Sequence, residues 1–287
     1  MPTSTLSSST ATTSPHLRVW LNDRLVDPAE ARVSALDHGL VVGDGVFEAF
    51  KVGPAGAFSV RRHLDRMTRS ARAMGLPDPD HAVIREAVEA TIAGRAYEHG
   101  KIRITYTGGA GPLGSQPASG PPTLVVAADS RTLSEPEATI LTTPWTRNER
   151  GAMTGVKTTS YGENVRGLAY AYDRQATEAI FLNTAGNVCE GTGSNLFVVS
   201  GGVVHTPPLN SGPLAGITRE LLIEWSDVVE SDLTLDQAQA ADEVFLTSSL
   251  RDVQPVTRWD DQTYAVGPVT RQLAEMFARR CAADLEP

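Results

Sequence analysis

The sequence predicts an α+β fold that is divided into two domains. A chain of 287 residues exceeds the usual size of one domain, and a hydrophobic fraction of 41% can form a substantial core. Strand and helix patterns follow one another without the regular alternation that builds a doubly wound sheet. We expect a small N-terminal domain over residues 16–130, a linker over 131–136 and a larger C-terminal domain over 137–287. The Ser/Thr-rich residues 1–15 are expected to form a flexible tail.

In the N-terminal half, alternating apolar residues indicate strands, and apolar residues at helical spacing indicate helices. The strands are expected at 17–21, after the turn at 22–24, within 41–52, at 101–107 and at 123–128. The helices are expected at 63–74 and 81–97, and Gly75 and Pro77 end the first of them. Residues 108–122 are rich in Gly, Pro and Ser, so they are expected to form a loop.

The C-terminal half follows a polar stretch at 129–136, which contains the expected linker. Its sequence again mixes short apolar runs with helical periodicity. The expected strands are 179–182, 195–199 and 243–247, and the expected helices lie near 164–176, 218–225 and 269–283. No internal repeat is visible, so a repeat architecture is not expected.

The composition argues against several classes of protein. With 34 Asp and Glu against 25 Lys and Arg, the net charge of −9 disfavours nucleic-acid binding. No apolar run approaches the roughly 20 residues of a membrane span, and the N-terminus lacks the pattern of a secretory signal. Two distant cysteines, Cys189 and Cys281, and six histidines without an HExxH pattern predict no metal site. We expect a cytoplasmic protein without nucleic-acid or membrane partners.

Two residues could carry covalent or electrostatic chemistry. Lys157 is flanked by small and apolar residues, and burial would lower its pKa and make its amine a nucleophile toward carbonyls. A lysine at the end of a strand that reaches solvent is the alternative interpretation. Glu190 precedes a run of small residues that would let a flat ligand approach the backbone. A buried Glu needs a cationic partner, such as a protonated ring nitrogen; a capped turn is the alternative.

Two further features could bind phosphate. Residues 214–219 open a helical pattern, so backbone N–H groups and the Thr218 hydroxyl could bind an anion there. Arg66 could add a bidentate contact. An ordinary capped helix and a solvated arginine are the alternatives. Together with Lys157 and Glu190, these features suggest pyridoxal 5′-phosphate (PLP). The chain has no P-loop motif and no strand–GxGxxG–helix unit, so nucleotide-binding interpretations are set aside.

The sequence resembles the class IV aminotransferases, the PLP fold-type IV group. That group includes branched-chain aminotransferases, D-amino acid aminotransferases and 4-amino-4-deoxychorismate lyases. The resemblance covers nearly the whole chain from Val19 to beyond Pro255, and its motifs occur in the family's order. They are residues 43–48, 63–66, 157, 190–197, 216–219 and 247–249. The resemblance implies a site between a small N-terminal domain and a larger PLP-binding C-terminal domain, at the interface of a homodimer.

The resemblance also implies roles for individual residues. Lys157 would bind PLP as an aldimine and then move the proton between Cα and C4′ as the catalytic residue. Glu190 would pair with the pyridine nitrogen. The phosphate would be held by Arg66, Ile217, Thr218 and Ser249, with Gly216 in the same cofactor-binding segment. Leu214 would pack against the ring, and Phe47 would lie near the substrate.

The sequence indicates the substrate and its binding residues less specifically than it indicates the cofactor. Arg103, with Lys101 beside it, is a candidate for binding a substrate carboxylate, and a solvated arginine is the alternative. Residues 157–178 align without gaps to the D-amino acid branch, which favours D-alanine or D-glutamate with a 2-oxo acid as acceptor. The loop at 108–120 lacks the Arg-x-His pair of well-known D-amino acid enzymes, and Lys101 replaces a Tyr of the branched-chain enzymes. The alternatives are 4-amino-4-deoxychorismate lyase, which makes p-aminobenzoate for folate, a branched-chain L-amino acid aminotransferase, and a non-catalytic PLP-binding protein.

Overall fold

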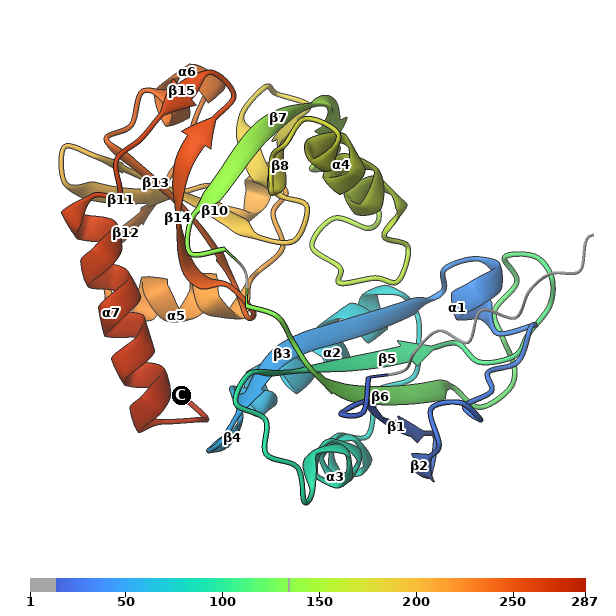
Figure 1. Ribbon diagram of the computed structural model, residues 1–287. Helices are drawn as coiled ribbons and strands as arrows, with labels where there is room; N and C mark the ends of the chain where they lie inside the picture. The colour runs from blue at the N-terminus through green and yellow to red at the C-terminus, as the bar shows by residue number, and fades with distance from the viewer. Residues whose placement is uncertain (1–13, 134) are drawn as a thin grey trace, which may run out of the picture.

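The N-terminal half forms one antiparallel sheet with two long helices on one face (Figure 1). The computed structural model describes residues 14–133 and 135–287, so most of the tail expected at 1–15 lies outside the described residues. The elements are β1 (Arg18–Leu21), β2 (Arg24–Val26), α1 (His38–Val41), β3 (Gly45–Gly53), β4 (Gly56–Ala57), α2 (Val60–Ala73), α3 (His81–Ile92), β5 (Gly100–Thr107) and β6 (Thr123–Ser130). The six strands are ordered β2-β1-β6-β5-β3-β4.

The C-terminal half forms a larger mixed sheet. Its elements are β7 (Ala138–Arg147), α4 (Gly162–Tyr172), β8 (Glu178–Asn183), β9 (Val188–Gly191), β10 (Asn195–Ser200), β11 (Val203–Thr206), the 3-10 turn η1 (Leu209–Ser211), α5 (Ile217–Trp225), β12 (Val228–Glu230), α6 (Leu235–Gln239), β13 (Glu243–Ser248), β14 (Asp252–Trp259), β15 (Gln262–Thr263) and α7 (Pro268–Ala283). The order is β12-β11-β10-β13-β14-β7-β8-β9, with β15 paired to β14. The α+β class and the two domains are therefore confirmed, while the exact boundaries at 130 and 137 stay a prediction.

Two predicted helices have the wrong ends, and some elements of the structure were not predicted. The helix predicted at 81–97 ends at Ile92, because Gly94 adopts φ +69° and turns the chain away. The helix predicted from residue 63 begins at Val60. Strand β7 was not predicted, since Pro144 interrupts its pattern, and the strand has a register shift around that position. The short helix α1 was also missed; the Asp37 side chain caps it by accepting the Gly39 N–H at 2.9 Å.

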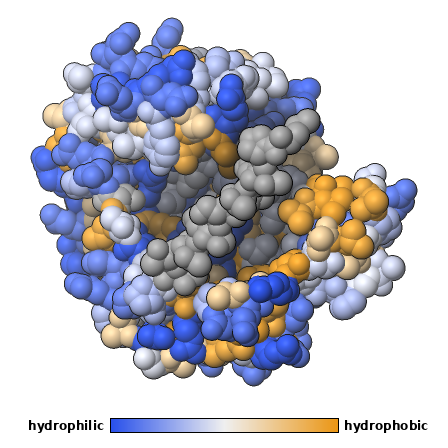
Figure 2. All heavy atoms as spheres, turned by 45° about the vertical axis from the view of Figure 1, so that its right-hand side comes forward, coloured by the Kyte–Doolittle hydropathy of each residue, from blue (hydrophilic) through white to orange (hydrophobic). Residues whose placement is uncertain are grey.

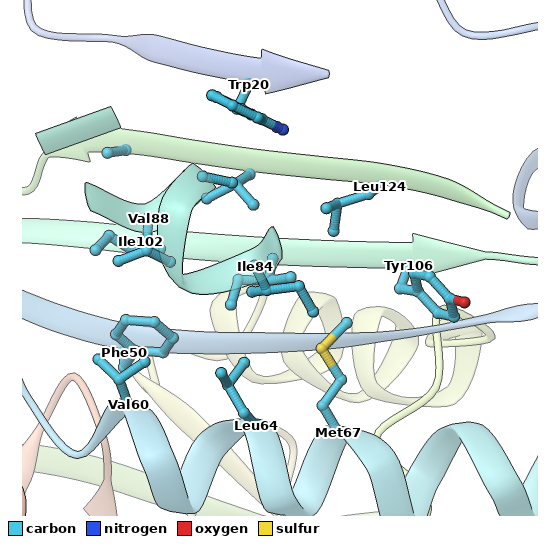
Figure 3. Packing of buried hydrophobic residues seen from close by; sticks show 14 of the residues in the cluster. Trp20, Phe50, Val60, Leu64, Met67, Ile84, Val88, Ile102, Tyr106 and Leu124 are labelled. Carbon is cyan, nitrogen blue, oxygen red and sulfur yellow. The ribbon is translucent and has the colours of Figure 1, made fainter. Parts of the chain in front are cut away.

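The N-terminal core fills the space between the sheet and its two helices (Figure 3). Leu64 and Met67 project from α2 toward β3, where Phe50 is fully buried. Ile84 brings α3 into the same cluster, and Ile102 adds the centre of β5. Burial of these large side chains provides most of the driving force that holds α2 over β3.

The end of the chain ties the two domains together. The Leu285 carbonyl accepts the Ser59 N–H at 2.6 Å, and Phe58 packs edge-on against Phe277 of α7 at 6.3 Å between ring centroids. Figure 1 shows the C-terminus beside β4 accordingly. Lys51 of β3 pairs with Asp252 of β14 at 2.5 Å. These contacts set the position of the start of α2 relative to the C-terminal sheet.

The surface of the described residues is mixed in character. Figure 2 shows a face where hydrophilic residues predominate and apolar groups emerge in patches. Leu40 and Leu113 are the most exposed of the large hydrophobic residues, and scattered apolar side chains are common on protein surfaces. Within residues 14–133 and 135–287, no helix has the length and hydrophobicity to cross a membrane. The same ranges contain no cluster of three His, Cys, Asp or Glu side chains that could hold a metal.

Replacing Phe50 with alanine should lower the free energy of unfolding by about 3–5 kcal/mol, because the cavity left behind is enclosed by the sheet and α2. Urea denaturation measures the change. Val83→Ala, at a position on α3 that is 37% exposed, is the control and should stay within about 0.5 kcal/mol. Equal stability of the two variants would contradict this account of the core.

Candidate active site

A cavity of about 620 Å³ lies where the two domains meet. Ala49 and Arg66 line it from the N-terminal domain. The rest of the wall comes from the C-terminal domain, above all from the loop after β7, the end of β9, the start of α5 and the end of β13. The wall includes Arg147, Lys157, Tyr161, Glu190, Leu214, Gly216, Ile217, Thr247 and Ser249. A cavity between domains with convergent polar groups is the usual form of a small-molecule site.

Lys157 lies on the loop between β7 and α4, but the N-terminal domain holds it. Its carbonyl accepts the Phe47 N–H at 2.9 Å, and its own N–H donates to Ser70 Oγ of α2 at 3.2 Å. Its Nζ lies 4.5 Å from the centroid of the Phe47 ring. Burial, aided by the charge of Arg66, lowers the pKa of Lys157 from 10.5 to about 8. About a tenth of the amine is therefore neutral and nucleophilic at pH 7, far more than for an ordinary lysine.

Glu190 places a carboxylate in the same cavity at the end of β9. Its Oε2 accepts the Leu214 N–H at 2.9 Å, and the Arg147 guanidinium lies 3.9 Å from its Oε1. Burial raises the pKa of Glu190, and Arg147 opposes that rise. The Arg147 guanidinium is stacked over the Phe181 ring at 4.5 Å, which fixes its direction. The carboxylate is thus suited to pair with a cationic N–H group of a ligand.

The wall formed by the start of α5 and the end of β13, called here the anion wall, is suited to a negatively charged group. Gly216 precedes α5 without a side-chain cap, so the first N–H groups of the helix are free for a ligand. A Cβ at position 216 would collide with Asn195 Oδ1, so any larger residue there would require the Asn195 side chain to shift. Thr247 Oγ1 is buried without a hydrogen-bond partner among the described residues. Ile217 lines the cavity, whereas Thr218 is buried behind it.

Arg66 reaches this wall from α2 in the other domain. Its Nη1 donates to the Ala215 carbonyl at 2.9 Å, just before α5 begins. Ser249 lies across the same wall at the end of β13, with its Oγ 3.2 Å from His63 Nε2. The structure therefore brings together Arg66, Ile217 and Ser249, which are far apart in the sequence. All three line the cavity, and their role in binding an anion stays a prediction.

The predicted substrate residues are placed less uniformly. Phe47 and Arg103 lie side by side on neighbouring strands, with the Arg103 guanidinium 3.9 Å from the Phe47 ring centroid. Arg103 Nε also donates to Thr105 Oγ1 at 3.2 Å. Since Phe47 contacts Lys157, this pair adjoins the reactive amine. None of Phe47, Lys101 and Arg103 is among the residues that line the cavity, and Lys101 is exposed at the start of β5.

Two further wall residues were missed by the sequence analysis. Tyr161 packs edge-on against Phe47 at 5.2 Å and donates its hydroxyl to the Thr192 carbonyl at 3.1 Å. Burial raises its pKa to about 12, so it stays a neutral hydrogen-bonding group. Arg147 is the other. Tyr161 lies only four residues after Lys157 in the sequence, a proximity that could have drawn attention to it; no comparable local signal marks Arg147.

The family is decided by comparison with known proteins. Residues 45–259 match the family described as "Amino-transferase class IV". The chain belongs to the class IV aminotransferase family. The matched range runs from the first residue of β3 to the last residue of β14, so it includes every wall of the cavity.

This class IV aminotransferase is similar to proteins that are named for different amino acid substrates. A Methanocaldococcus jannaschii protein, provisionally named a branched-chain-amino-acid aminotransferase, is 33% identical and covers 91% of this chain and 95% of its own. A Staphylococcus epidermidis D-alanine aminotransferase is 30% identical, with 91% and 97% covered. The crystal structure of the T.th. branched-chain amino acid aminotransferase with pyridoxamine 5′-phosphate superposes with a TM-score of 0.85 at 28% identity, covering 91% and 93%. The predicted family and fold type are confirmed.

The lowered pKa of Lys157 predicts how its reactivity depends on pH. Because burial disfavours the charged form, the neutral amine should accumulate around pH 8, and labelling of Lys157 by an amine reagent should be half-maximal there. The chain has three lysines, Lys51, Lys101 and Lys157, so peptide mass spectrometry of protein freed of small molecules separates the sites. Lys157→Ala is the control that removes this component. Labelling that keeps rising beyond pH 10 would contradict the assigned environment.

Proposed function

We propose that this chain transfers an amino group between an amino acid and a 2-oxo acid, with D-amino acids such as D-alanine or D-glutamate as donors. The observation that carries the proposal is Lys157, a partly neutral amine in the cavity between the domains, beside the Glu190 carboxylate. An amine of this kind reacts with carbonyl carbon, which is the first requirement of amino transfer. A homodimer and a cytoplasmic location, both expected from the sequence, are part of the proposal.

Pyridoxal 5′-phosphate is the cofactor of this class IV aminotransferase, and its aminated form is present in the T.th. structure. The cavity fits it on its own evidence. The uncapped start of α5 and the unpartnered Thr247 hydroxyl suit a phosphate, Glu190 suits a protonated ring nitrogen, and Lys157 suits an aldehyde. When bound, the cofactor supplies an electron sink that stabilises negative charge at the substrate Cα.

Lys157 has two tasks in the proposed reaction. Its neutral amine would hold the cofactor at its aldehyde carbon, and once freed by the substrate amine, Nζ would accept the proton of the substrate Cα and donate one to the cofactor's reactive carbon. A pKa of about 8 suits both tasks, since the amine can accept and release a proton near neutral pH. The backbone contacts of Lys157 with Phe47 and Ser70 hold the loop that carries it.

Glu190 and the anion wall orient the cofactor. Glu190 would accept the ring N–H and keep that nitrogen protonated, and Arg147 at 3.9 Å favours the ionised carboxylate that this requires. Arg66, Ser249 and the N–H groups of Ile217 and Thr218 would bind the phosphate. Leu214 would cover one face of the ring. These contacts together would fix the orientation of the cofactor beside Lys157.

The substrate assignment rests on relatives and on one side chain. The similarity to the S. epidermidis D-alanine aminotransferase supports D-amino acid donors. The similarity to the M. jannaschii and T.th. proteins supports a second candidate, branched-chain L-amino acids. Arg103, beside Phe47, is the proposed anchor for a substrate carboxylate in either case.

The experiment that tests the proposal is a half-reaction. The PLP-loaded enzyme is mixed with one amino acid at a time, in D and L forms and without acceptor, while its visible absorbance is followed. We expect loss of the absorbance with D-alanine or D-glutamate and not with L-leucine. Loss with L-leucine alone would favour the branched-chain candidate. No loss with any amino acid, together with pyruvate release from aminodeoxychorismate, would overturn the proposal in favour of the lyase.

Arg103→Ala should raise KM for D-glutamate about tenfold while kcat changes much less, because a charge-assisted contact to the substrate is lost. Steady-state kinetics with D-glutamate and D-alanine measures the effect. Lys101→Ala is the companion variant: its side chain is exposed at the start of β5, whereas Arg103 is half-buried against Phe47, so we expect less than about a threefold change. An unchanged KM in Arg103→Ala would remove Arg103 from the substrate site.

A further inference from the structure

We propose that Glu48 and His63 are positioning residues that hold Arg66 and Ser249 in the orientation needed to bind the cofactor phosphate. This inference rests on the proposed function, because it assigns the phosphate to the wall formed by Arg66, Ser249 and the start of α5. Neither Glu48 nor His63 lines the cavity. They act through Arg66 and Ser249, which do line the cavity.

Glu48 occupies a position that the strand pattern reserves for an apolar residue. Along β3 it lies in the same buried row as Val46 and Phe50, and it is fully buried. Its carboxylate accepts Arg66 Nε at 2.8 Å on Oε1 and Arg66 Nη2 at 2.6 Å on Oε2. His63 Nδ1 also lies 2.7 Å from Oε2. A single carboxylate thus holds two side chains that are three residues apart on α2.

The charges of this group determine how its hydrogen bonds run. Burial opposes ionisation of Glu48, but Arg66 and His63 together bring its pKa to about 2, so the carboxylate is charged. Burial lowers the pKa of His63, which is therefore neutral. A neutral imidazole that donates Nδ1–H to Glu48 leaves Nε2 as the acceptor, and the Ser249 hydroxyl, 3.2 Å away, donates its one proton to that nitrogen. The backbone N–H of Ser249 is then the group that would donate to the phosphate.

The group is directed at the anion wall. Two sides of the Arg66 guanidinium are fixed, one by Glu48 and one by the Ala215 carbonyl before α5. Its remaining N–H groups are left to bind a ligand. Ser249, which comes from the C-terminal domain, is fixed by His63 from the opposite domain. Apolar residues would fill this space at lower cost than a buried ion pair, so the group is best explained by its orienting role.

The test compares affinity for PLP with affinity for pyridoxal, which lacks the phosphate. Dissociation constants are measured from the visible absorbance of the full-length protein, and thermal unfolding confirms that each variant is folded. Glu48→Gln should weaken PLP binding about tenfold or more and change pyridoxal binding less than about threefold. A purely structural role would weaken both ligands alike or lower stability without a change in their ratio, and either result would overturn the inference.

His63 offers a matched pair of variants in case Glu48→Gln does not fold. The amide of an asparagine stands near the place of Nδ1, whereas that of a glutamine reaches the place of Nε2. His63→Asn should therefore lose the Ser249 contact and weaken PLP binding several-fold, and His63→Gln should recover part of that loss. Equal losses in both variants, or no loss in either, would overturn the role of His63.

The wild-type protein separates failure of this inference from failure of the proposed function. If it binds PLP much more tightly than pyridoxal, a phosphate site exists, and unchanged ratios in Glu48→Gln and His63→Asn refute only the positioning role. If it binds PLP no more tightly than pyridoxal, the phosphate site fails, and the positioning role fails with it.

Discussion

The site depends on a short pairing between the two domains. Residues 157–159 belong to the loop after β7, yet they lie against the first residues of β3: the Phe47 N–H donates to the Lys157 carbonyl, and the Thr159 N–H donates to the Gly45 carbonyl at 2.8 Å. Val46 and Thr158 form an isolated β-bridge there. Backbone pairing of this kind fixes direction more strictly than side-chain packing alone. Lys157 therefore faces a cavity whose walls come from both domains.

The electrostatics of the cavity divide its charged groups into two sets. Glu48 is fully occupied by Arg66 and His63, so its charge is neutralised behind the wall. Glu190 can still accept hydrogen bonds from a ligand in the cavity. Arg147 is 3.9 Å away, and the Leu214 N–H is its one close donor among the described residues. Two carboxylates in one buried region thus have opposite shifts in pKa, the first downward and the second upward. The surroundings of each carboxylate, and not its residue type, therefore determine the direction of its pKa shift.

The groups proposed for the cofactor and for the substrate lie at different places in the chain. The groups proposed to handle the cofactor lie on the C-terminal domain and on α2, within residues 45–259 that match the family. The proposed substrate side is the opposite face of β3 and β5, where Phe47 and Arg103 lie. The guanidinium on that face would bind a carboxylate without by itself selecting a D or an L amino acid. The same fold can therefore serve several amino acid substrates.

The class of fold, the family and several residues of the cavity wall could be predicted from the sequence, because they depend on local periodicity and on motifs a few residues long. The strand at β5 and the helix at α7 are predicted to within one residue. The pKa of Lys157, the pairing across the domains and the roles of Glu48, His63 and Arg147 could not be predicted in this way. His63 and Ser249 are 186 residues apart, and no local pattern encodes a contact of that separation. Burial and long-range contacts arise only when both domains are assembled, so these properties follow from the fold and not from any segment of it.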